Sequence, residues 1–436
     1  MSSLETTARP DLLDRLLAGA GVRPGEGVAL LWSFVYFFAL LCGYYTIRPV
    51  RDAMGAVHAL EWLFTATFVV MLLLQPLYAA LVGRFPRRVF LPVVYGFFIL
   101  CLLGFYVLLA ADTGASWRSG AFFVWVAVFN LFAVSVFWSF MSDIFGEDQA
   151  RRLYGTIAAG GTLGALAGPL LTQALVQLIG APAMLLVAAG LVGLCLIAIF
   201  RLIPWARARE RGSAPAERAG VGGGILEGAT RILRSRFLFA LALLMFFGVA
   251  VGTLLYNEMA TYTRQALPDP AERTAWYARI DLAINLLTVS IQLLLTRRLL
   301  SRYGPSPLLI LPPSLVAIAF LPMILLPGLP LLLAFAQIIA RSGNFSLLQP
   351  ARESLFTRVD RIERYKVKNF IDTVIYRGGD VSFAWLHKGL TVAGLGGAGI
   401  AAAGFFCALA LTAAGIWVAK LAHGSPPARP IGGASQ

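Results

Sequence analysis

Charged residues are scarce in this chain. Only 13% of its 436 residues are Asp, Glu, Lys or Arg, whereas 58% are hydrophobic and the mean hydropathy is +0.77. An average soluble domain is about 25% charged. Many apolar runs also approach the roughly 20 residues that cross a bilayer as a helix. The composition therefore excludes a soluble globular protein and predicts a polytopic membrane protein with the lipid bilayer as its surroundings.

Residues that build metal centres, disulfides and catalytic sites are also few. The four cysteines lie singly within apolar runs, and the three histidines are far apart in the sequence. Neither set has the spacing of a disulfide framework or of a metal site, and no residues suggest a catalytic triad. We therefore expect no metal, no cofactor and no enzyme activity.

The formal net charge of +14 is carried by short loops between the apolar runs. Such loops retain Lys and Arg on the cytoplasmic side of a membrane, so the charge predicts an orientation and no nucleic-acid partner. Alternate loops are basic, which places both termini in the cytoplasm. The basic loops lie near residues 84–88, 151–152, 201–236, 297–302 and 352–368.

The apolar runs predict eleven membrane helices directly, and loop parity requires a twelfth. The second half of the chain must begin and end on the basic side, so the charged stretch 367–392 must also cross the membrane. The runs lie near residues 27–47, 59–83, 89–111, 118–142, 155–179, 181–202, 236–260, 277–298, 306–327, 330–350 and 394–419.

The two halves of the chain resemble each other. Leu81–Phe85 matches Leu299–Tyr303 about half a chain length later, each between the second and third helix of its half. Twelve helices in two parallel six-helix bundles are the arrangement of the major facilitator fold. The predicted parts are a cytoplasmic segment 1–26, a bundle 27–202, a cytoplasmic linker 203–235, a bundle 236–420 and a cytoplasmic tail 421–436.

Polar residues share one face of the first helix. Tyr44, Arg48 and Arg51 fall within a wedge of about 60°, Asp52 follows directly, and Pro49 can loosen the helix between the arginines. The two arginines either extend to the outer headgroups or face an anion in the protein interior.

Helix 277–298 carries one polar stripe of Asp281, Asn285, Thr288 and Gln292, at spacings of four, three and four residues. A stripe of this kind is costly in lipid, so it lines a wet cavity or bonds to neighbouring helices. On other helices, Glu258 is a candidate coupling or ion-pair residue, and Arg341 and Asn344 are candidate solute-binding residues.

The stretch 367–392 holds Lys368, Asp372, Tyr376 and Asp380 at four-residue steps, with Arg377 beside them. These charges either neutralise one another as ion pairs or line the solute pathway. If transport is proton-coupled, an aspartate among Asp281, Asp372 and Asp380 is the expected proton acceptor.

Glycines at positions 160, 164 and 168 recur every fourth residue in helix 155–179. A phosphate-binding glycine loop needs a preceding strand and a lysine at its end, and neither is present. The pattern instead predicts a smooth helix face for close packing.

The charged stretch from Arg341 to Asp380 resembles the signature of the ATP/ADP antiporters of plastids and obligate intracellular bacteria. The sequence departs from that signature at Leu348 and Gln349, and at Arg352, where the family has a lysine. The matching patches are Phe345–Leu347, Pro350–Glu353, Lys366–Lys368, Asp372 and Arg377–Gly379, with weaker matches at Tyr45–Asp52 and Ala150–Tyr154.

This resemblance implies a major-facilitator-type fold that exchanges nucleotides, with basic residues that bind the phosphates. By position, the implied phosphate-binding residues are Arg48, Arg51, Arg352, Lys366 and Lys368, with Glu353 as a neighbouring acid.

We therefore expect a bacterial inner-membrane carrier of a small anionic solute such as ATP or ADP, functional as a monomer. It would work by alternating access, through exchange or proton coupling. Two alternatives remain: a proton-driven carrier of an unrelated small solute, or a membrane receptor or scaffold that kept the fold without transporting. The polar stripe argues against a scaffold, which has little use for a wet interior.

Overall fold

A computed structural model of the chain describes residues 22–23, 25–84, 87–111, 117–212, 225–356, 367–368 and 370–424. Most of the predicted N-terminal segment, part of the predicted linker, the tail beyond residue 424 and the candidate Lys366 lie outside these residues. All secondary structure in the described ranges is helical, which confirms the all-α prediction.

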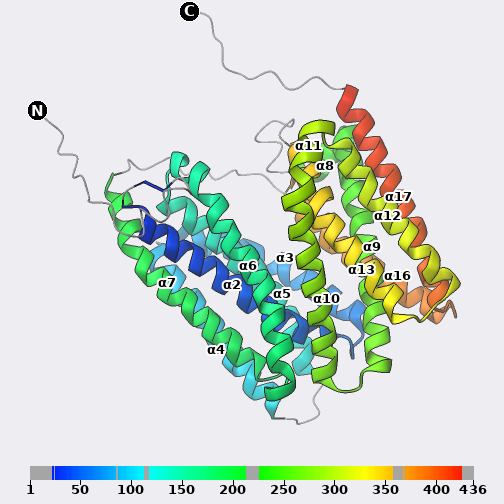
Figure 1. The fold of residues 1–436 in the computed structure, drawn as a ribbon, viewed down its shortest axis with the longest axis horizontal. Helices are drawn as coiled ribbons and strands as arrows, with labels where there is room; N and C mark the ends of the chain where they lie inside the picture. The colour runs from blue at the N-terminus through cyan, green and yellow to red at the C-terminus, as the bar shows by residue number, and fades with distance from the viewer. Residues whose placement is uncertain are drawn as a thin grey trace, which may run out of the picture. The chain divides into compact units, whose positions relative to one another are not determined.

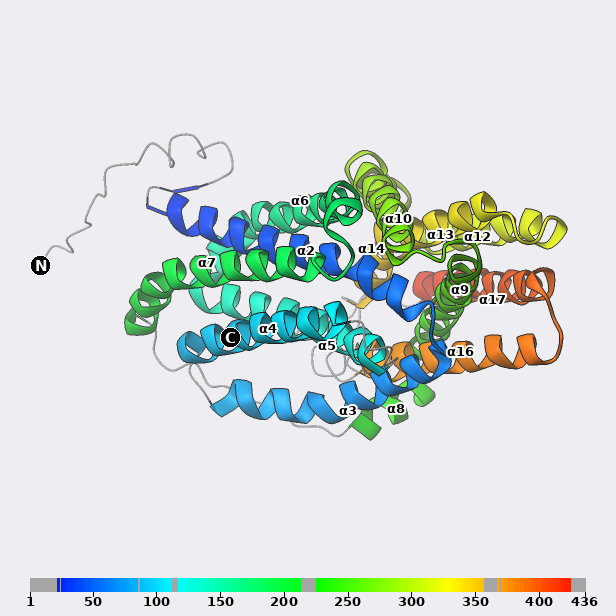
Figure 2. The same cartoon turned by 90° about the horizontal axis from the view of Figure 1, so that it is seen from below.

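The first part of the chain contains six long helices (Figures 1 and 2). They are α2 (Gly27–Gly55), α3 (Leu60–Arg84), α4 (Arg87–Ala110), α5 (Trp117–Ile144), α6 (Glu147–Ile179) and α7 (Met184–Gly212).

The second part is more interrupted. Its elements are α8 (Ile225–Arg234), α9 (Arg236–Ala266), α10 (Pro270–Ile291), η2 (Gln292–Thr296), α11 (Arg297–Tyr303), α12 (Ser306–Leu325), α13 (Pro330–Gly343), η3 (Asn344–Leu348), α14 (Gln349–Phe356), η4 (Ile371–Ile375), α16 (Tyr376–Val392) and α17 (Gly397–Gly424).

The chain forms two compact units. The first comprises residues 1–58, 70–217 and 269–282, and the second comprises residues 59–69, 218–268 and 283–436. The start of α3 thus belongs to the second unit and the start of α10 to the first. The predicted bundle limits at 27–202 and 236–420 stay predictions.

Ten helices within the described ranges are long and apolar enough to cross a membrane. The predicted crossing at 367–392 is not among them because of its charges, yet residues 370–392 are continuously helical through η4 and α16. The first part of α3, Leu60–Leu74, is a shorter apolar helix.

Three segments, η2, η3 and η4, are single turns of π-helix. A π-turn adds one residue to a helical turn and often marks a functional site. In η4 it interrupts the four-residue spacing between Asp372 and Tyr376, so the charged residues of this helix do not continue along one straight face. Within α16, which follows the π-turn, Tyr376 is 37% exposed and Asp380 is 8% exposed.

The glycine face of α6 is closely packed, as predicted, and its partner is α2. A Cβ atom at Gly160 would lie 2.7 Å from the carbonyl oxygen of Phe34, and one at Gly164 would lie 2.3 Å from that of Phe38. Thr172 extends this contact by donating a hydrogen bond to the carbonyl oxygen of Thr46 at 3.1 Å. Small residues are what allow two backbones to approach this closely.

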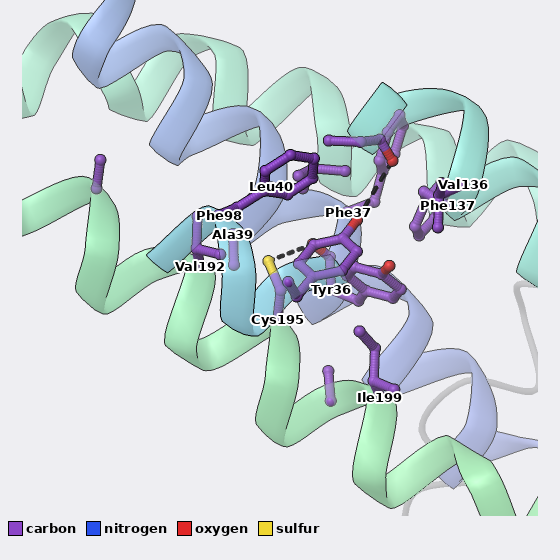
Figure 3. Close-up of a cluster of buried hydrophobic side chains, with 14 of the residues drawn as sticks. Tyr36, Phe37, Ala39, Leu40, Phe98, Val136, Phe137, Val192, Cys195 and Ile199 are labelled. Atoms are coloured by element: carbon purple, nitrogen blue, oxygen red, sulfur yellow. Dashed lines mark hydrogen bonds between the residues drawn. The ribbon is translucent and has the colours of Figure 1, made fainter. Parts of the chain in front are cut away.

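Aromatic rings fill the core beside this contact (Figure 3). Phe37 stacks on Phe137 with ring centroids 4.3 Å apart, and Tyr36 meets Phe137 edge-on at 4.8 Å. Cys195 is buried with its thiol 3.6 Å from the carbonyl oxygen of Tyr36, so it acts as a small core residue. This apolar core fixes α2 against α5 and α7.

A polar network ties the start of α2 to the start of α6. Glu26 accepts two hydrogen bonds from Arg152, each of 3.1 Å, one from Gln149 at 2.9 Å and one from the backbone N–H of Arg23 at 3.0 Å. Burial by itself raises the pKa of Glu26, but these hydrogen bonds outweigh it and hold the pKa below its usual value.

We expect Glu26→Gln to lower the free energy of unfolding by about 2 kcal/mol near neutral pH, because hydrogen bonds to a charged group are lost. A carboxylate whose pKa is lower in the folded state stabilises the fold at pH values above its unfolded-state pKa of about 4.3. That stabilisation is lost as the pH falls through the folded-state pKa. In thermal unfolding in detergent, the stabilities of wild type and Glu26→Gln should therefore become equal once the pH is below the folded-state pKa of Glu26. Glu147→Gln, at an exposed α6 pair with Arg151, is the control and should have no effect at any pH. A constant difference for Glu26→Gln across the acidic range would contradict the assignment.

Candidate functional site

Arg48 lies near the C-terminal end of α2 and is only 7% exposed. Its Nη1 is 3.3 Å from Oδ1 of Asp281 in the first part of α10, and its Nε is 3.9 Å from Oδ2 of Asp52. Both carboxylates are buried, with exposures of 2% and 3%. The first compact unit thus holds a guanidinium between two acids in an otherwise apolar interior.

Arg51 completes this cluster from the next turn of α2. Its Nε donates to Oδ1 of Asp52 at 2.8 Å, and its guanidinium carbon lies 4.6 Å from the centre of the Phe123 ring. Both guanidinium groups thus have acids and aromatic rings of the same unit as neighbours. Tyr45, at 5.6 Å from Arg48, adds a further ring.

The second compact unit has its own basic cluster at α14. Lys368 Nζ lies 2.6 Å from Oε2 of Glu353, and Nη2 of Arg352 lies 3.4 Å from Oε1 of the same carboxylate. Nη1 of Arg352 also contacts the sulfur of Met245, at 2.6 Å. Among the described residues, the buried Nε of Arg352 has no hydrogen-bond partner.

Two polar pairs join α9 to α16 in the same unit. Thr253 donates to Oδ1 of Asp380 at 2.9 Å, and Arg377 contacts the other oxygen of that carboxylate at 3.3 Å. Nearer the C-terminal ends of both helices, His387 Nε2 lies 2.8 Å from Oε1 of Glu258. The sequence offered no signal for His387 as a partner, because a lone histidine in an apolar helix has no motif around it.

The remaining candidates have different surroundings. Arg341 lies over the ring of Phe345 at 5.8 Å, and Asn344 is exposed. Tyr44 packs edge-on against Tyr45. Asn285 is 9% exposed.

The polar stripe runs from α10 into η2, and its residues have different surroundings. Asp281 pairs with Arg48, whereas Gln292 is exposed and donates to the carbonyl oxygen of Phe345 at 3.2 Å. Thr288 is buried, and within the described part of the chain its hydroxyl has no hydrogen-bond partner. The stripe is thus bonded to other helices at Asp281 and Gln292.

Buried cations held by carboxylates inside an apolar helical bundle are costly, and in membrane proteins they mark solute or ion pathways. The first compact unit contains such a group at Arg48, and the second holds the partly buried Arg352 beside Glu353, as expected of a membrane transporter.

The chain belongs to the Major Facilitator Superfamily, whose sequence model matches residues 28–359. No curated protein matches the sequence. The family confirms the predicted fold class, twelve transmembrane helices in two six-helix bundles, and makes the protein a multi-pass secondary transporter rather than an enzyme.

Solved structures of transporters share this fold. A bacterial homologue of the human lysosomal transporter Spinster, in an inward-facing and unoccupied conformation, is 15% identical with a TM-score of 0.57, covering 92% of this chain and 96% of its own. The nucleoside transporter NupG is 14% identical with a TM-score of 0.59 (91% and 99%). The POT family transporter PepTSo is 12% identical with a TM-score of 0.59 (91% and 98%). At these identities the likeness concerns the fold.

Proposed function

We propose that this transporter carries an anionic, phosphorylated solute of nucleotide type, such as ATP or ADP, across a bacterial inner membrane. It works as a monomer by alternating access, with both termini in the cytoplasm. The observation that carries the solute class is the presence in each compact unit of an arginine with little exposure, Arg48 in one and Arg352 in the other.

Arginine suits phosphate because its planar guanidinium donates two parallel hydrogen bonds to one phosphate group. The resemblance of the region around α14 and η4 to nucleotide antiporters points to the same chemistry. The other predicted phosphate-binding residues are Arg51, Lys366 and Lys368, and Arg341, Arg377, Tyr44, Asn285 and Asn344 are predicted to line the pathway.

Both basic clusters are charge-balanced. Arg48 and Arg51 have Asp52 and Asp281 as partners, and Arg352 and Lys368 have Glu353 between them, with Asp372 in the following π-turn. An incoming phosphate must therefore displace a carboxylate from a cation, or arrive with protons that neutralise it. Exchange of one anion for another would use the first route, and proton-coupled transport would use the second.

A thermal-shift panel on the purified protein in detergent tests the solute class. We expect ATP or ADP to raise the unfolding temperature while adenosine does not, because phosphate supplies the binding energy. Stabilisation by an unrelated solute would favour the proton-driven alternative, and stabilisation by no solute in the panel would favour the scaffold.

Lys368→Ala should weaken nucleotide binding by about 10-fold or more, because a charge-assisted contact is worth about 1.5–3 kcal/mol. The measurement is the concentration of ADP that gives half the maximal thermal shift. Lys420→Ala, at an exposed lysine near the end of α17, is the matched control and should bind like the wild type. Equal binding by the two variants would remove Lys368 from the site.

A further inference from the structure

The Glu258–His387 pair is a further ionisable site, distinct from both basic clusters. Glu258 lies on α9 and His387 on α16, with 2.8 Å between Oε1 and Nε2. Both are largely buried, with side-chain exposures of 19% and 11%. An imidazole is the side chain whose charge changes most readily near neutral pH, and here it directly contacts a carboxylate within a helix bundle.

A second ion pair adjoins this pair in the sequence of α16. The next residue, Lys388, has its Nζ 3.8 Å from Oε1 of Glu61 at the start of α3, whose side chain is 10% exposed. These four groups comprise two carboxylates, one ammonium and one imidazole. With a neutral imidazole they sum to one negative charge, and protonation of His387 brings the sum to zero.

The helices α9 and α16 and the elements packed against them carry further ionisable groups. The Asp380 carboxylate is bound by Thr253 and Arg377, and α12 faces Glu258 with the apolar side chains Phe320 and Met323. The remaining groups are Tyr256, Tyr262, Arg236 and Arg264 on α9, Tyr376 on α16, Arg341 on α13, Arg231 and Arg234 on α8, Asp372 on η4, and Cys407 and Lys420 on α17.

We propose that Glu258 and His387 form the proton-binding site that couples transport to a proton gradient. A proton from water adds to the imidazole, which gives an imidazolium–carboxylate pair, and the same proton leaves to water on the other side of the membrane. The pair bridges α9 and α16, the same two helices that Thr253 and Asp380 join. Proton binding therefore changes the strength of a polar link between these helices.

This inference rests on the proposed transport of a phosphorylated anion only for its flux measurement. Proton binding itself is tested without any solute. The chain has three histidines, so carbon-13 labelling of histidine gives a simple NMR spectrum, and His387→Gln identifies the His387 signal.

We expect the His387 signal to move between two positions across roughly pH 5 to 9, and Glu258→Gln to change the pH at which it moves. His58 is the control histidine, bonded to Ser119 in the other compact unit, and its signal should not respond to Glu258→Gln. A His387 signal that stays constant over this range, or a transition indifferent to Glu258→Gln, would overturn the proton site.

The flux measurement uses protein reconstituted into liposomes loaded with ADP. In the wild type, an inside-alkaline pH gradient should accelerate uptake of labelled ADP beyond the rate of simple exchange. His387→Gln should keep exchange and lose the acceleration, whereas His58→Gln keeps both. Equal acceleration in His387→Gln and wild type would refute the coupling role.

The two proposals fail in different ways. If the wild type exchanges no nucleotide, the proposed solute is wrong, while the His387 titration still decides the proton site. If exchange is normal and neither the titration nor the gradient response depends on this pair, the solute stands and the proton site is refuted.

Discussion

Replacing Arg48 by alanine is expected to abolish transport and to lower the free energy of unfolding by about 3–5 kcal/mol. The substitution leaves the carboxylates of Asp52 and Asp281 buried without the cation between them, and removal of one partner from a buried pair typically costs that much. The measurements are nucleotide uptake into liposomes and thermal or denaturant unfolding in detergent.

A second substitution separates charge from geometry. Arg48→Lys keeps the positive charge but loses the planar fork, so we expect it to recover most of the stability and little of the transport. Arg302→Ala, at an exposed arginine of α11, is the matched control and should change neither property. Wild-type uptake in Arg48→Ala would remove this residue from the solute pathway.

Gly164→Ala is expected to destabilise the first compact unit by about 3 kcal/mol or more. Its Cβ would lie 2.3 Å from the carbonyl oxygen of Phe38 and 2.9 Å from the backbone N of Cys42. Because both atoms belong to the backbone of α2, no side chain can move aside and the two helices must separate.

Gly155→Ala is the matched control on the same helix. A Cβ at Gly155 meets no atom within 4 Å, so this change should be neutral or stabilising by about 0.5–1 kcal/mol. Unfolding in detergent compares the two variants. Equal stability of the two would show that α2 and α6 do not pack as closely as described.

Most of the helical architecture was predictable because it depends on local patterns. Apolar runs locate helices, glycine every fourth residue predicts a closely packed face on α6, and loop charges require the polar helix at 367–392. The π-turn η4 was not predictable, because the inserted residue leaves no trace in composition. It changes which faces Asp372 and Asp380 occupy.

The candidate residues were predictable by type but not by partner. Buried charges in apolar helices stand out, so Arg48 and Asp281 were both identified, but their contact joins helices far apart in the sequence. His387 was missed because nothing next to it suggests Glu258, which lies 129 residues earlier. Pairings of this kind depend on tertiary packing, which a single sequence does not specify.

Uptake by the reconstituted wild-type protein tests the central proposal most directly. Liposomes are loaded with unlabelled ADP, labelled ATP or ADP is added outside, and the label inside is measured over time against empty liposomes and the Arg48→Ala variant. A phosphorylated-solute carrier predicts uptake that needs both the wild-type protein and internal nucleotide or an imposed pH gradient. Uptake no greater than in empty liposomes, for every nucleotide and under both driving forces, would contradict it.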